Sequence, residues 1–140
     1  MNATPQSVIP LLHAVVKAEA SDLHVKVGSA PRVRVDGRLR RLQVPVLTPM
    51  DTDHMLSQVL PSDLVDQFER THEADFAYSV AGVGRFRVNA YQARGTTAMV
   101  FRLVGMGTSS LAELGVPGIV GDLALEPRGL VLVTGPTGAG

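Results

Sequence analysis

The sequence predicts an α+β fold, in which helices pack on an antiparallel sheet of about six strands. Two regions, 22–42 and 76–104, alternate apolar and polar residues with the period of half-buried strands. Between them, from Thr48 to Thr71, apolar residues recur at helical spacing. Strand groups separated by helical sequence are typical of a two-layer domain.

A predicted helix from Pro5 to Ala20, which Thr4 can cap, precedes the first region. A strand follows from residue 22, with Leu23, Val25 and Val27 on its apolar side. Asp36-Gly37 then separates two short alternating runs, a pattern that favours a hairpin because both turn residues need positive φ.

The second region follows two predicted helical segments, which start at Thr48-Pro49 and restart at Pro61. Residues 75–104 alternate through three runs separated by glycine turns, which predicts a three-stranded meander. Arg87 and Arg102 lie on its second and third strands. Each is expected to project from the face opposite its large apolar neighbours.

The last stretch carries the one motif with a specific chemistry. Leu130 to Val133 form a short apolar run, typical of a strand buried on both faces. Gly135, Pro136, Thr137, Gly138, Ala139 and Gly140 follow, and they match the first six positions of the phosphate-binding loop G-x-x-x-x-G-K-[ST]. In that loop, backbone N–H groups close on phosphate oxygens where a Cβ would interfere. We therefore expect a piece of a P-loop ATPase that stops before the lysine; the alternative is a flexible glycine-rich tail.

Composition adds an uneven charge distribution. The 140 residues include no cysteine and have a formal net charge of +0, which argues against a dedicated nucleic-acid binder. Residues 51–75 are mostly acidic among their charged positions, whereas residues 76–112 hold four arginines and no acidic residue. Arginines without carboxylates nearby in the sequence predict contact with an anion or an acidic surface.

Four stretches carry a resemblance to a known family. They are Ala20-Ser-Asp-Leu-His24, Arg34-Val-Asp-Gly37, Gly84-Arg-Phe-Arg-Val-Asn-Ala90, and the stretch from Pro127 to Gly140. Together they resemble the PilT family of type IV pilus retraction ATPases, within the type II/IV secretion ATPase superfamily. The resemblance implies a PAS-like N-terminal domain at 1–104, an interdomain linker at 105–127, and at 128–140 the first strand and truncated P-loop of a RecA-like ATPase domain.

The same resemblance implies a function. The full-length protein would be a homo-hexameric motor that binds ATP and Mg²⁺, in the cytoplasm at the inner-membrane base of the pilus machine. It would contact the inner-membrane platform protein, without nucleic acid and without inserting into the membrane. Arg87 and Arg102 would reach the triphosphate by motif position. The 140-residue stretch, which lacks the P-loop lysine, is expected to hold no bound nucleotide or metal and to be inactive.

Other interpretations remain open at this point. A related assembly or secretion ATPase, including the PilU type, shares much of the pattern, and a PAS-like ligand-binding or protein-interaction module without ATPase activity is a different class. From spacing alone, Arg87 and Arg102 are surface arginines paired with the acidic helices. Asp22 is expected to cap or pair locally, and His24 to make a structural hydrogen bond. Residues after Gly140 reading Lys-Ser or Lys-Thr would decide for the motor.

Overall fold

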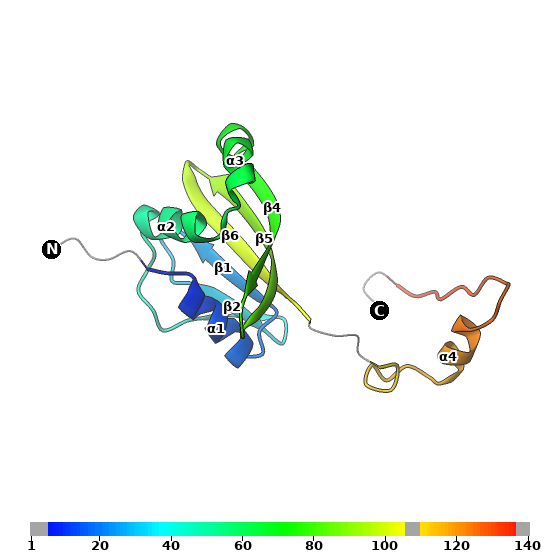
Figure 1. Ribbon diagram of the computed structural model, residues 1–140. Helices are drawn as coiled ribbons and strands as arrows, with labels where there is room; N and C mark the ends of the chain where they lie inside the picture. The colour runs from blue at the N-terminus through cyan, green and yellow to red at the C-terminus, as the bar shows by residue number, and fades with distance from the viewer. Residues whose placement is uncertain (1–5, 106–109, 137–140) are drawn as a thin grey trace. The chain divides into compact units, whose positions relative to one another are not determined.

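The computed structural model describes residues 6–105 and 110–136, and it confirms the predicted α+β fold (Figure 1). The chain divides into two compact units, Met1–Met106 and Gly107–Gly140. The helices and strands, in chain order, are α1 (Ile9–Lys17), β1 (Asp22–Lys26), β2 (Arg32–Val35), β3 (Arg38–Arg41), α2 (Pro49–Val59), the 3₁₀ turn η1 (Ser62–Leu64), α3 (Val65–Thr71), β4 (Glu73–Val80), β5 (Gly84–Ala93), β6 (Thr96–Val104) and α4 (Ile119–Ala124).

All six strands form one antiparallel sheet with the order β3-β2-β1-β6-β5-β4. The hairpin between β2 and β3 turns at Asp36 and Gly37, whose φ angles of 49° and 74° confirm the predicted tight turn. The three-stranded meander of β4, β5 and β6 is also as predicted. Its last strand pairs with β1, which joins the two strand groups into one sheet.

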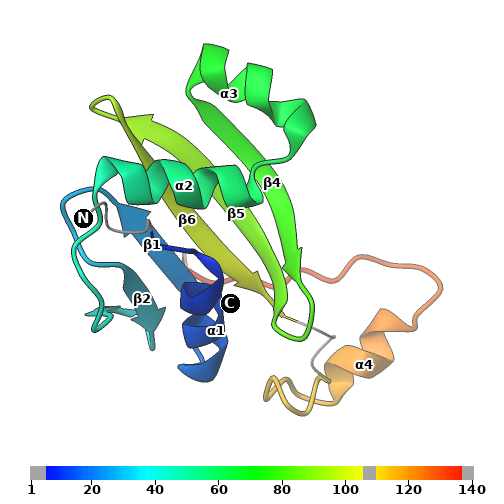
Figure 2. The ribbon, with the colours of Figure 1, turned by 60° about the vertical axis from the view of Figure 1, so that its left-hand side comes forward.

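Helices α1, α2 and α3 pack against one face of this sheet, and α2 crosses in front of the central strands (Figure 2). The largest fully buried side chains include Phe86 and Phe101 from the strands, and Leu12 and Met55 from the helices. Because strand side chains alternate, burying these residues turns their polar neighbours to the other face. No helix of the first unit's described part covers that second face, which we call the open face.

The helices begin where their sequence allows. Thr48 caps α2, since its side chain accepts a hydrogen bond from the backbone N–H of Asp51, while the Asp51 carboxylate accepts one from the backbone of Thr48. Helix α1 is shorter than predicted and starts at Ile9, because Pro10 has no N–H to donate and fits only the first turn. The predicted cap Thr4 lies outside the described residues.

The second unit differs from the prediction. Its described helix is α4, and the predicted strand at Leu130 to Val133 is absent from the described residues. Those four side chains are between 56% and 93% exposed. A strand of the parallel, doubly buried type needs neighbours on both sides, and none is present in this unit's described part. None of the described helices is long and apolar enough to cross a membrane.

Candidate functional site

The open face carries a row of charged residues that runs across four neighbouring strands. Arg87 on β5 lies directly opposite Arg102 on β6. Arg102 in turn lies opposite Asp22 on β1, and Asp22 lies opposite Arg34 on β2. Directly opposite residues on adjacent strands project from the same face, so these four side chains share one surface. The structure therefore brings together the two arginines predicted from the sequence and adds two residues to them.

The strongest interaction in the row joins Arg102 to Asp22. Nε of Arg102 donates a hydrogen bond of 2.9 Å to Oδ1 of Asp22. The carboxylate is nearly buried, with its side chain 6% exposed, whereas the arginine side chain is 69% exposed. Burial would raise the pKa of Asp22, but the hydrogen bonds from Arg102 and Ser21 outweigh it and hold that pKa below its ordinary value.

The second oxygen of Asp22 is also engaged. Oδ2 lies 3.2 Å from Nε of Arg34 and accepts a hydrogen bond of 2.8 Å from the Ser21 hydroxyl. Nη1 of Arg34 donates to the backbone oxygen of Gly37, which ties the side chain to the β2–β3 turn. The expectation that Asp22 caps or pairs locally holds only for its contact with Ser21. Its two arginine partners are distant in sequence, because β1 lies between β2 and β6 and has an arginine on each side of Asp22.

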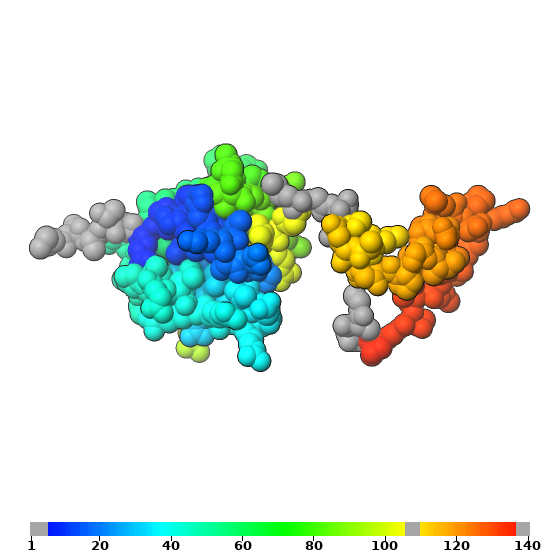
Figure 3. Space-filling model, turned by 90° about the horizontal axis from the view of Figure 1, so that it is seen from below, coloured from blue at the N-terminus to red at the C-terminus, as the bar shows by residue number. Residues whose placement is uncertain are grey.

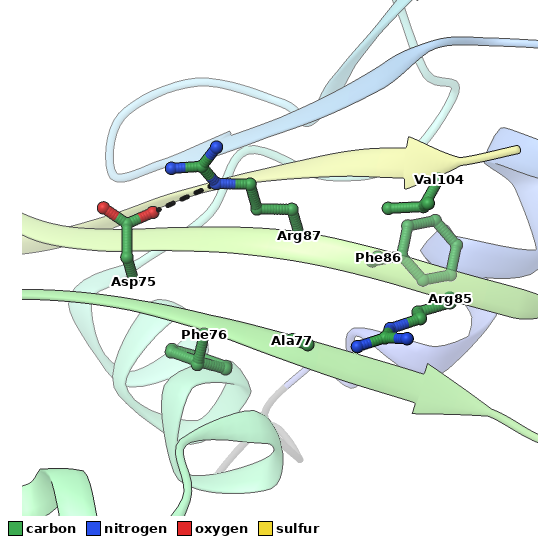
Figure 4. Close-up of a pocket in the computed structure, with 7 residues that line it drawn as sticks. All are labelled: Asp75, Phe76, Ala77, Arg85, Phe86, Arg87 and Val104. Atoms are coloured by element: carbon green, nitrogen blue, oxygen red, sulfur yellow. Dashed lines mark ion pairs between the residues drawn. The ribbon is translucent and has the colours of Figure 1, made fainter. Parts of the chain in front are cut away.

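Arg87 is held more loosely. Its Nε lies 3.7 Å from Oδ1 of Asp75 on β4, and the two side chains are 71% and 50% exposed. Figure 4 shows the two groups extending toward each other from neighbouring strands. The partners of Arg87 and Arg102 are thus carboxylates on strands of the same sheet and not, as spacing alone suggested, those of the acidic helices.

Open hollows flank these arginines. One, of about 380 Å³, is lined by residues that include Asp75, Arg87 and Arg102. Another, of about 390 Å³, lies beside Arg87 and is lined in part by Arg85 and Val104 (Figure 4). The first of these offers space at the guanidinium groups of Arg87 and Arg102 for a small polar ligand.

The charge in the row is unbalanced toward positive. Arg87 and Arg102 face each other as like charges, an arrangement that destabilises a sheet unless an anion lies between them. Among the described residues, the Nη nitrogens of both arginines donate no hydrogen bond, since the contacts to Asp22 and Asp75 use Nε. Two exposed guanidinium groups on adjacent strands can therefore contact the oxygens of one phosphate group.

His24 lies next to this row on β1, and it does not behave as predicted. Its Nε2 is buried and has no hydrogen-bond partner among the described residues, so the expected structural hydrogen bond through that atom is absent. Burial lowers the pKa of His24, and the positive charge of Arg34 lowers it further, which favours the neutral imidazole.

The predicted phosphate-binding loop belongs to the second unit. Gly135 and Pro136 are exposed and lie in no helix or strand, while Thr137, Gly138, Ala139 and Gly140 lie outside the described residues. Within residues 6–105 and 110–136, no group of three or more histidine and acidic side chains is placed to hold a metal ion.

Comparison with known proteins identifies several relatives. The chain is 38% identical to the type IV pilus retraction ATPase PilT of Pseudomonas aeruginosa over 133 residues, which covers 95% of this chain and 39% of the relative. It is 37% identical to the type IV pilus ATPase PilU of the same organism, covering 93% of this chain and 34% of that protein. No family model matches the chain.

Solved structures of ATPases share the fold of this chain. A crystal structure of the pilus retraction motor PilT with bound ADP matches with a TM-score of 0.80 at 35% identity, covering 95% of this chain and 39% of that chain. The Legionella pneumophila ATPase DotB matches with a TM-score of 0.75 at 21% identity over 99% of this chain and 40% of its own, a likeness of fold alone.

The chain spans less than two fifths of the length of the two curated relatives described above. Over that length, both the sequence and the six-stranded fold match. The chain therefore belongs to the secretion ATPase family that includes the pilus retraction ATPases, and it corresponds to their N-terminal region.

Proposed function

We propose that this chain is the N-terminal part of a hexameric ATPase motor that drives type IV pilus retraction, and that its open face supplies Arg87 and Arg102 to the triphosphate of ATP. The observation that carries the proposal is the pair of exposed guanidinium groups directly opposite each other on β5 and β6. The similarity to a retraction motor whose structure contains ADP supports it.

The chemistry of phosphoryl transfer suits this pair. Negative charge spreads over the oxygens of the transferring phosphoryl group, and catalysis depends on groups positioned to stabilise it. Arginine stays charged and presents a planar fork of donors, so each arginine can bind two oxygens of the phosphoryl group. Lysine binds them less well, because its ammonium is a compact and strongly hydrated point charge. Mg²⁺, when bound, would neutralise further phosphate charge.

The rest of the proposal concerns the parts around the arginines. Residues 1–104 form the domain that presents them, residues 105–127 act as the linker, and Gly135 to Gly140 begin the loop that holds the phosphates. The assembled protein works in the cytoplasm at the inner-membrane base of the pilus machine, in contact with the platform protein there. The proposal also assigns a PAS-like fold to residues 1–104.

Steady-state ATPase assays on the full-length hexamer test the role of the arginines. A positioned arginine is worth about 10³–10⁵ in rate in P-loop enzymes, so Arg102→Ala and Arg87→Ala should lower kcat far more than they raise KM for ATP. Lysine at either position should rescue poorly, because it lacks the planar fork. Arg41→Ala, an exposed arginine on the edge strand β3, is the matched control and should leave kcat unchanged.

Size-exclusion chromatography on each variant excludes a simple assembly defect. Wild-type turnover in both Arg87→Ala and Arg102→Ala would contradict the proposal and leave the domain as a structural adaptor.

A second candidate is a PilU-type accessory role, because the identity to PilU is almost as high as the identity to PilT. Deleting the gene in its own host separates the two. Loss of pilus retraction with piliated cells supports the primary motor, whereas retraction that persists at reduced force supports the accessory role.

A further inference from the structure

Asp22 is one of two charged residues that are buried in the described part of the chain. Its exposed fraction is 4%, and the other such residue, Asp51, is 7% exposed. Asp51 has a clear structural task, because it completes the N-terminal cap of α2. Asp22 caps no helix, and it lies in the middle of the arginine row on the open face. Burying a carboxylate costs free energy unless the group is paired. The partners of Asp22 therefore indicate what this residue does.

The hydrogen bond between Asp22 and Arg102 leaves the two Nη nitrogens of Arg102 available for a ligand. Oδ1 of Asp22 accepts from Nε of Arg102, at the side of the guanidinium nearest the main chain. The two Nη nitrogens at the far end, which form the fork that binds phosphate, donate no hydrogen bond among the described residues. Asp22 thus holds the guanidinium by one edge and leaves the other edge for an anion.

The carboxylate is itself fixed by two further groups. Oδ2 contacts Nε of Arg34 at 3.2 Å and the hydroxyl of Ser21 at 2.8 Å. Arg34 is anchored in turn to the backbone oxygen of Gly37 at 3.0 Å. Because both oxygens are engaged, the carboxylate has little freedom to rotate, and the orientation of Arg102 is set before any ligand arrives.

We propose that Asp22 is a positioning residue, which orients Arg102 for its contact with the triphosphate and is itself held by Arg34 and Ser21. This inference rests on the proposed function. Arg87 offers the contrast, since its contact with Asp75 is 3.7 Å long and exposed to water. Arg102 is therefore the preorganised member of the pair, and Arg87 is the adaptable one.

A double-mutant cycle in the full-length hexamer tests the inference. Asp22→Asn removes the charge while keeping the shape, and we expect it to lower kcat about tenfold, with KM for ATP changed less than about twofold. In the Arg102→Ala background, Asp22→Asn should have no further effect on kcat, because a residue that acts only through Arg102 loses its effect when Arg102 is gone. Asp36→Asn, the same change in the exposed β2–β3 turn, is the matched control and should leave kcat unchanged.

Arg34→Gln provides a second route if Asp22→Asn fails to assemble. Losing one anchor of the carboxylate should lower kcat about threefold, and this loss should also vanish in the Arg102→Ala background. A reduction of equal size in both backgrounds, with either variant, overturns the inference and assigns Asp22 to stability alone. If Arg102→Ala itself turns over ATP like the wild type, the inference fails, and the proposed function fails with it only when Arg87→Ala also keeps wild-type turnover. If Arg102→Ala is slow and Asp22→Asn is not, only the inference fails.

Discussion

The two faces of the six-stranded sheet are built from the same strands but have opposite character. The covered face is apolar and packs against α1, α2 and α3. The open face carries Arg87, Arg102 and Arg34 around one buried carboxylate. Adjacent residues on β6 show the contrast between the two faces, because Phe101 on the covered face is fully buried and the side chain of Arg102 on the open face is 69% exposed.

The contrast between the two faces explains how the fold holds a charged site in a fixed position. Each arginine of the open face is flanked along its strand by residues that the core holds in place, such as Phe86 and Val88 around Arg87. The backbone below the charged groups is therefore fixed by hydrophobic packing, although the exposed arginine charges themselves contribute little to folding. Substitutions on the two faces should separate stability from activity.

The largest expected effect is on the covered face. Phe101→Ala should lower the free energy of unfolding by about 3–5 kcal/mol, because it leaves a cavity in a fully buried position. Val100→Ala, one residue away on the open face and half-buried, should cost about 1 kcal/mol. Urea unfolding of the 140-residue chain followed by circular dichroism measures both values. Equal losses would show that the open face is as tightly packed as the covered one.

An intermediate effect is expected for Asp22, the one buried charge of the open face. Asp22→Asn should cost about 1–3 kcal/mol near pH 7, less than for a fully buried ion pair because both arginine partners reach water. Since the folded-state pKa of Asp22 is lowered, its ionised form stabilises the fold above the unfolded-state pKa of about 3.9.

That contribution is lost as the pH falls through the lower, folded-state pKa of Asp22. The stability gap between the wild type and Asp22→Asn should therefore be constant at neutral pH and close under acidic conditions. Urea unfolding at a series of pH values measures the gap. A gap that widens on acidification would contradict the pairing described here.

The smallest expected effect is at Arg87. Arg87→Ala should change the free energy of unfolding by less than about 0.5 kcal/mol, because its exposed contact with Asp75 is worth little and its repulsion with Arg102 is relieved. The residual effect should disappear in about 1 M salt, where the Debye length is about 3 Å. Thermal unfolding at low and high salt measures it, and a loss above about 1 kcal/mol would mean that Arg87 is part of the packing.

Local signals were sufficient for most of the fold. Alternation located the strands, Asp36-Gly37 located the hairpin, and Thr48-Pro49 located the start of α2. The same alternation placed Arg87 and Arg102 on the face away from the core, as the structure confirms. These features depend on neighbours within a few residues, which is why one sequence was enough to predict them.

The order of the strands was not predictable in this way. β1 pairs with β6, so Asp22 meets Arg102 across 80 positions of sequence. Alternation assigns a residue to a face but does not say which strand lies beside it, so the sequence alone gives these arginines no carboxylate partner. An acidic residue at the start of a strand rich in apolar neighbours was the available signal, because a carboxylate in such surroundings requires a partner. The strand predicted at Leu130 to Val133 failed for a related reason, since a strand depends on partners that local sequence does not supply.

The edge strand β3 has a consequence for solubility. Its four residues are all exposed, and three of them are arginines, at positions 38, 40 and 41 (Figure 3 shows the hairpin in cyan on the surface). An edge strand offers unpaired backbone groups to any other strand, but two copies of β3 placed side by side would bring like charges together. The hairpin thereby discourages uncontrolled sheet-to-sheet aggregation at this edge.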